Sequence, residues 1–112
     1  MTVDVFSQYF RAECGSGENA RKGALVSLTA DSGAGRVLYT INVTFFFHKS
    51  AEDFAVNYDI FESAVLYDEK GRRSKKREAE FVKNLSQIAD SLAQKRNAKI
   101  FWNEPLSEAR RG

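Results

Sequence analysis

Five cations close together in the sequence are the clearest candidates for a functional site in this chain. They are Arg72, Arg73, Lys75, Lys76 and Arg77, in the stretch DEKGRRSKKREAEF, where the hydrophobic pattern predicts that a helix begins. Exposed cations in the first turn of a helix cost about 0.3 to 1 kcal/mol each, because the helix dipole places positive charge there. A bound phosphate would reverse this effect, since free N–H groups and cationic side chains would then point at one anion. The cluster therefore predicts phosphate contacts, and nucleic acid as the partner.

A structural interpretation of the same cations stays open. Residues 51–69 hold six acids and no base, whereas residues 70–77 hold six bases and no acid. The bases could simply lie beside the acidic segment and neutralise it in a solvated loop. The net charge of +2 does not decide between the two interpretations, because only the distribution of charge points to nucleic acid.

A second candidate surface is one face of the stretch 36–48, which alternates as a strand does. Its polar face holds Arg36, Thr40, Asn42, Thr44, Phe46 and His48. Aromatic side chains on a sheet face stack the bases of single strands, so Phe46 is the stacking candidate. Arg36, with Arg21 and Lys22 at a loop end, is expected to add phosphate contacts. The same face would also suit a homo-oligomer interface, because one helix covers only one side of a sheet.

Several functional classes are excluded. The chain has one cysteine, Cys14, and one histidine, His48, too few for a structural zinc site, and no nucleophile, base and orienting group can be assembled. We therefore expect a protein that is not an enzyme and needs no cofactor or metal. No secretory signal is visible and no apolar run approaches the roughly 20 residues that span a bilayer, which predicts a cytoplasmic protein without membrane contact.

The elements that must position these residues are mostly strands. Alternation and β-branched or aromatic residues predict strands over 2–12, 24–30 and 36–47, with a polar loop at 14–22 and a turn at DSGAG. Residues 50–67 fit either a strand or a helix with an N-cap at Ser50. We favour the strand, paired back on 36–47 as a long hairpin, with DEKG as the next turn.

The clearest element is a helix over about residues 75–96. Phe81, Leu85, Ile88 and Leu92 form one apolar stripe, Ser74 is the expected N-cap, and Asn97 is expected in the left-handed conformation after the last turn. Residues 100–102 form a short apolar segment that is expected to return the chain to the core after the helix. We therefore predict an α+β fold in one domain, residues 1–102: an antiparallel sheet of about four strands followed by one long amphipathic C-terminal helix packed on one face. Residues 103–112 are expected to be a polar, flexible tail.

The segment Arg21-Lys22-Gly23-Ala24-Leu25, together with the order of strands and helix, resembles the Whirly-type single-stranded DNA-binding fold and the related transcriptional-coactivator fold. The second lysine of the Whirly Lys-Gly-Lys-Ala-Ala-Leu motif is absent here. The resemblance implies a dimer formed through the helix and single strands bound on the sheets.

Taken together, the sequence predicts a non-enzymatic protein that binds nucleic acid, single-stranded DNA or RNA, through the basic cluster and the sheet face. The alternative is a small protein-interaction module, an adaptor or inhibitor, that uses the acidic segment 52–69 or the open sheet face.

Overall fold

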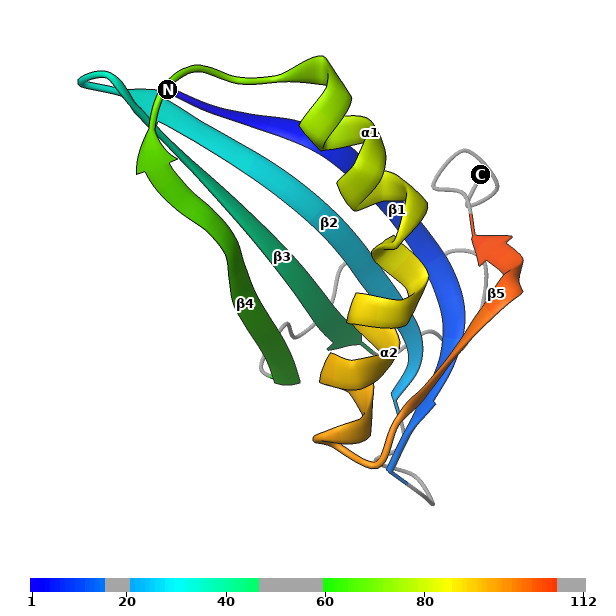
Figure 1. The fold of residues 1–112 in the computed structure, drawn as a ribbon. Helices are drawn as coiled ribbons and strands as arrows, with labels where there is room; N and C mark the ends of the chain where they lie inside the picture. The colour runs from blue at the N-terminus through cyan, green and yellow to red at the C-terminus, as the bar shows by residue number, and fades with distance from the viewer. Residues whose placement is uncertain (16–20, 47–59, 107–112) are drawn as a thin grey trace.

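The fold is an antiparallel sheet of five strands with two consecutive helices on one face (Figure 1). The computed structural model describes residues 1–15, 21–46 and 60–106. The elements in chain order are β1 (Thr2–Cys14), β2 (Arg21–Gly33), β3 (Arg36–Phe46), β4 (Ile60–Lys70), α1 (Lys75–Lys83), α2 (Leu85–Gln94) and β5 (Lys99–Leu106). The strand order is β4-β3-β2-β1-β5, so that β4 and β5 are the two edges.

The first three strands form because each alternates between apolar and polar side chains. In β3, Val37, Tyr39, Ile41, Val43 and Phe45 are buried, whereas Leu38, Thr40, Asn42 and Thr44 between them are half-buried. This confirms the alternation predicted for these residues. A two-residue turn, Ala34-Gly35, joins β2 to β3, with Gly33 paired to Arg36. Both turn residues have positive φ, 54° and 73°, as a type I′ hairpin requires.

The core lies between the sheet and the helices. Leu85, Ala89, Leu92 and Ala93 of α2 are buried against Ile41 and Val43 of β3 and their neighbours on β1 and β2. Full burial of a leucine side chain contributes about 1.5 to 3 kcal/mol, so this stripe fixes the helices to the sheet. In Figure 1 the helices cross the sheet diagonally, and α1 begins near the end of the sheet where the β2–β3 turn and the last residues of β4 lie.

The predicted architecture of four strands followed by one long C-terminal helix is wrong. The helical region is divided at Asn84, whose backbone has φ −100° and ψ 8° and whose side chain donates to the Glu80 carbonyl. Asparagine favours such departures because its amide competes for backbone groups. The chain then continues as β5, which pairs with β1, so the sheet has a fifth strand and the described chain does not end in a helix.

Several boundaries also differ from the expectations. Residues 60–67 are strand, as we favoured, but β4 continues through Lys70, so Asp68-Glu69-Lys70 belong to a strand rather than to a turn. Residues 103–106, assigned to the tail, belong to β5, and 107–112 lie outside the described residues. The helix signals at Ser74 and Asn97 are confirmed: Ser74 caps α1, and Asn97 has φ 54°. The expectations for Phe47, His48 and residues 50–59 lie outside the described residues.

Candidate nucleic-acid interface

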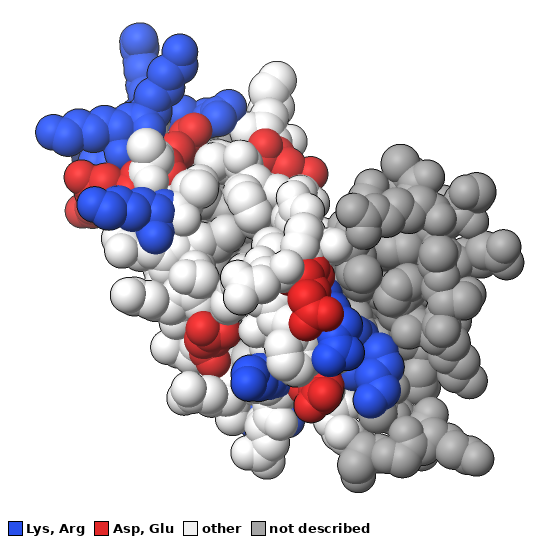
Figure 2. Space-filling model, turned by 90° about the vertical axis from the view of Figure 1, so that its right-hand side faces the viewer, with Lys and Arg blue, Asp and Glu red and all other residues white. Residues whose placement is uncertain are grey.

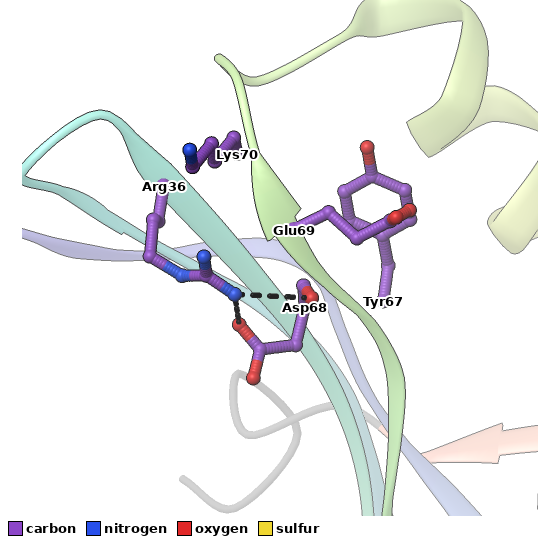
Figure 3. A pocket seen from close by; sticks show the side chains of 5 residues that line it. All are labelled: Arg36, Tyr67, Asp68, Glu69 and Lys70. Carbon is purple, nitrogen blue, oxygen red and sulfur yellow. Dashed lines mark hydrogen bonds and ion pairs between the residues drawn. The ribbon is translucent and has the colours of Figure 1, made fainter.

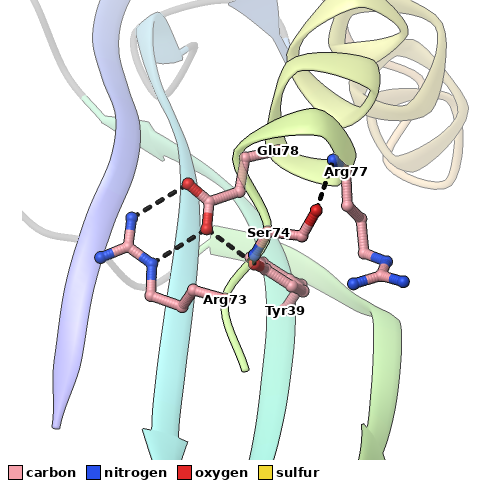
Figure 4. Close-up of polar contacts among 5 residues, drawn as sticks. All are labelled: Tyr39, Arg73, Ser74, Arg77 and Glu78. Carbon is pink, nitrogen blue, oxygen red and sulfur yellow. Dashed lines mark hydrogen bonds and ion pairs between the residues drawn. The ribbon is translucent and has the colours of Figure 1, made fainter. Parts of the chain in front are cut away.

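The beginning of α1 is held to the sheet by a hydrogen-bond network around Glu78 (Figure 4). The Tyr39 hydroxyl, on β3, donates to Glu78 Oε2 at 2.6 Å and accepts the Ser74 N–H at 3.1 Å. Arg73 donates to both oxygens of the same carboxylate, at 2.9 and 3.0 Å. The Ser74 hydroxyl accepts the Arg77 N–H at 3.2 Å and so caps the helix. These contacts give the segment that carries the predicted cations a defined position over β3.

This network is charged and partly buried. Tyr39 has no exposed surface and Glu78 is 8% exposed, whereas the Arg73 side chain is 42% exposed. The two hydrogen bonds from Arg73 lower the pKa of Glu78, against the opposing effect of burial, so its carboxylate is ionised at neutral pH. Burial, and then the hydrogen bond to Glu78, raises the pKa of Tyr39, which stays neutral. The charge of Arg73 is therefore largely compensated by Glu78.

Arg77 is held by an aromatic ring instead of an acid. Its guanidinium carbon lies 4.1 Å from the centroid of the Tyr67 ring, on β4. Tyr67 in turn contacts Tyr39, with ring centroids 6.0 Å apart. Stacking of this kind contributes about 0.5 to 1 kcal/mol at exposed sites and leaves the positive charge uncompensated. Arg77 is thus positioned but still able to attract an anion.

Arg72, Lys75 and Lys76 are exposed, and none of them forms an ion pair with another described residue. We call these three residues, together with Arg77, the cationic end. Figure 2 shows lysine and arginine side chains gathered at one extremity of the molecule, with a few acids among them. Four of the five cations of the predicted cluster therefore have no acidic partner among the described residues, whereas the fifth, Arg73, is paired with Glu78.

Arg36 lies at the same end of the sheet, beside a shallow hollow of about 400 Å³ (Figure 3). The hollow is lined by Arg36, Tyr67, Asp68, Glu69 and Lys70. Arg36 Nη2 lies 3.2 Å from Asp68 Oδ1, and both side chains are about half exposed. Two acids line this hollow along with two bases, so the site is close to neutral. Arg36 is near the cationic end but contributes little free charge.

Arg21 and Lys22 are not part of the same surface. They begin β2, whose last residue pairs with Arg36, and a strand of this length, 13 residues, spans about 40 Å. Arg21 is only 8% exposed and lies opposite Cys14 of β1. Lys22 is exposed. The two residues expected to support the cluster therefore lie at the far end of the sheet, and Arg21 is not accessible to a phosphate.

Phe46 is at the end of β3, as expected, but its side chain has no exposed surface. It packs edge-on against Tyr9, with ring centroids 5.6 Å apart, and it covers Gly23, where an added Cβ would lie 2.5 Å from the ring. The ring therefore presents no free face on which a base could stack.

Sequence reasoning missed Tyr39, Tyr67 and Glu78, which organise the site. Two signals were present. Tyr39 is the polar member of an otherwise apolar buried face, and a buried tyrosine hydroxyl needs a hydrogen-bond partner. Glu78 is the acid that directly follows the five cations, within the first turn of the helix. The position of Tyr67 beneath Arg77 had no comparable signal, because it is a tertiary contact between α1 and β4.

Comparisons with protein-family models, curated proteins and solved structures gave no match. The resemblance to Whirly-type proteins therefore stays a prediction. Within the described ranges, no helix has the length and apolar character needed to cross a bilayer. The same part of the chain brings together no group of three histidine, cysteine, aspartate or glutamate residues that could hold a metal ion.

Proposed function

We propose that this protein is a non-enzymatic nucleic-acid-binding protein that contacts phosphates through its cationic end, Arg72, Lys75, Lys76 and Arg77. The observation that carries the proposal is that these four side chains share one helix terminus and its linker, while no described acid pairs with them. Cations without an acidic partner contribute little to folding through ion pairs, whereas each of them can release a counterion from a nucleic acid.

The cationic end is expected to contact the sugar–phosphate backbone of the nucleic acid. Phosphate contacts position a protein on nucleic acid, whereas base contacts read its sequence. With Phe46 buried, the feature that favoured single strands is absent from the surface. Lysine and arginine side chains at a protruding helix end would contact single strands and duplexes alike. We therefore expect weak sequence preference, strong dependence on salt and no large preference for single strands.

The alternative function, a protein-interaction module built on the acidic segment, is less well supported by the described contacts. Glu62 Oε2 lies 2.7 Å from Arg96 Nε, and Asp68 forms an ion pair with Arg36. These two acids are thus partly compensated within the chain, in contrast to Arg72, Lys75 and Lys76. The acids Glu52, Asp53 and Asp59 lie outside the described residues.

A salt titration tests the proposal. The binding of a fluorescein-labelled single strand and of its duplex is measured by fluorescence anisotropy between about 50 and 200 mM salt. Each phosphate contact contributes about −0.7 to the slope of log affinity against log salt for single strands and about −0.9 for duplex. Four contacts predict slopes near −3 and −4. An affinity that does not change with salt, or no saturable binding at the lowest salt concentration, would exclude this function.

A further inference from the structure

The two edges of the sheet differ in their protection against pairing with another strand. β5 carries Pro105, which has no N–H, and it shifts register against β1 between Phe10 and Arg11. Natural sheets use such features to prevent edge-to-edge association. β4 has no proline, and it exposes Phe61 (53%) and Val65 (62%) on the face away from the helices. β4 itself shifts register against β3 between Val65 and Tyr67, but residues 61–65 lie before that shift and carry no proline.

Backbone groups of β4 also point outward at these positions. In an antiparallel strand, alternate residues direct their N–H and C=O groups to the same edge. The Phe61 carbonyl accepts a hydrogen bond at 3.2 Å from Arg96, a side chain that is not part of the sheet. Phe61, Ser63 and Val65 thus direct their backbone groups to the outer edge. The Phe61 carbonyl can accept a second hydrogen bond, because it has two lone pairs.

We propose that β4 pairs with β4 of a second copy of this chain, antiparallel about a twofold axis at Ser63. A twofold interface must be self-complementary. With Ser63 opposite Ser63 of the second copy, Phe61 lies opposite Val65 of that copy, and Val65 opposite its Phe61. The two exposed apolar side chains of each strand then cover those of the other. The two sheets join into one continuous sheet across the axis.

Charge selects this register over its neighbour. The only acid between residues 61 and 65 is Glu62, which lies opposite Ala64 of the second copy and keeps its own partner, Arg96. A twofold axis at Val65 would instead place Glu62 opposite Asp68 and Phe61 opposite Glu69. Acids directly opposite one another are destabilising, and a phenylalanine opposite an acid loses its apolar contact. The pattern of charge therefore favours the axis at Ser63.

Disulfide cross-linking tests the register. Ser63→Cys is prepared in a Cys14→Ala chain, so that the introduced thiol has no competitor. Residues opposite each other in a hydrogen-bonded pair have Cα atoms about 5.5 Å apart, within the range of about 4.4 to 6.8 Å that a disulfide needs. Ser63→Cys is therefore expected to form a covalent dimer under mild oxidation. Val65→Cys is the matched control, because its two copies would lie about 13 Å apart along the strand.

Sedimentation equilibrium tests the surface itself. Val65→Lys is expected to raise the dimer Kd on the order of a hundredfold, about tenfold for each of the two copies in a twofold interface. Val82→Lys, at an exposed valine on α1, should leave the Kd unchanged. A wild-type chain that stays monomeric at every concentration would overturn the proposal, even if it captured an added extended peptide along β4. Cross-linking of Val65→Cys in preference to Ser63→Cys would overturn it as well.

Discussion

The substitution Tyr39→Phe isolates the energetic contribution of the network that positions α1. It removes one hydroxyl and leaves the ring in place between Tyr67 and Phe81. The lost hydroxyl donates to a charged carboxylate and accepts a backbone N–H, and both contacts are buried or partly buried. A hydrogen bond to a charged group is worth about 1.5 to 3 kcal/mol, and a neutral one about 0.5 to 1.5. We expect a loss of about 2 to 4 kcal/mol in the free energy of unfolding.

Urea denaturation followed by circular dichroism measures this loss, and Arg36→Gln is its control. The Arg36–Asp68 pair also joins two elements, but both side chains are about half exposed, and exposed ion pairs contribute about 0 to 1 kcal/mol. The reasoning would be refuted if Tyr39→Phe and Arg36→Gln cost the same, or if Tyr39→Phe cost less than about 0.5 kcal/mol.

Further outcomes follow from single contacts. Glu78→Gln should lower the free energy of unfolding at neutral pH. Because the pKa of Glu78 is lowered in the folded state, the greater stability of the wild type is present above about pH 4.3 and is lost as the pH falls further. Urea denaturation of both proteins at several pH values measures this difference. The same substitution frees Arg73, so nucleic-acid affinity should rise and the salt slope steepen by about one contact. Gly23→Ala should cost about 1 to 3 kcal/mol in urea unfolding, because the Cβ would meet the Phe46 ring, whereas Gly33→Ala, with no atom within 4 Å, should cost little. Ala34→Gly should raise the free energy of unfolding by about 0.5 to 1 kcal/mol, measured in urea, since it relieves a positive φ.

The sequence predicted the elements whose pattern is local. The alternation of β3 and the capping residues Ser74 and Asn97 were identified correctly, because each depends on neighbours within a few residues. The strand prediction is also confirmed for residues 60–67, where a helix was the competing interpretation.

The errors concern features that depend on tertiary contacts. The residues Asp68-Glu69-Lys70 have poor strand propensity, but their pairing with Arg36, Val37 and Leu38 extends β4 through them. The fifth strand contains proline and charged residues and forms because β1 offers it an edge. Asn84 interrupts the helix within an apolar stripe that looked continuous, since periodicity records only which face is buried.

The candidate site shows the same division. Local clustering in the sequence identifies the run of cations, but not which of them are compensated. Arg73 is paired with Glu78, and Arg21 is buried at the far end of the sheet. Phe46 was expected on the accessible face because alternation placed it there. Its ring contacts Tyr9 of β1 and Gly23 of β2, and no pattern within β3 reveals such contacts.

The most direct test of the proposed function compares two triple variants with the same change in net charge. One carries Arg72→Gln, Lys75→Gln and Lys76→Gln; the other carries glutamine at three exposed lysines elsewhere, Lys83, Lys95 and Lys99. Anisotropy titrations with the labelled single strand should show that the first variant binds far more weakly, with a salt slope about 2 smaller than that of the wild type. The second should lose much less affinity and keep its slope. Equal losses in the two variants would contradict a defined cationic end and would reduce the interaction to net charge alone.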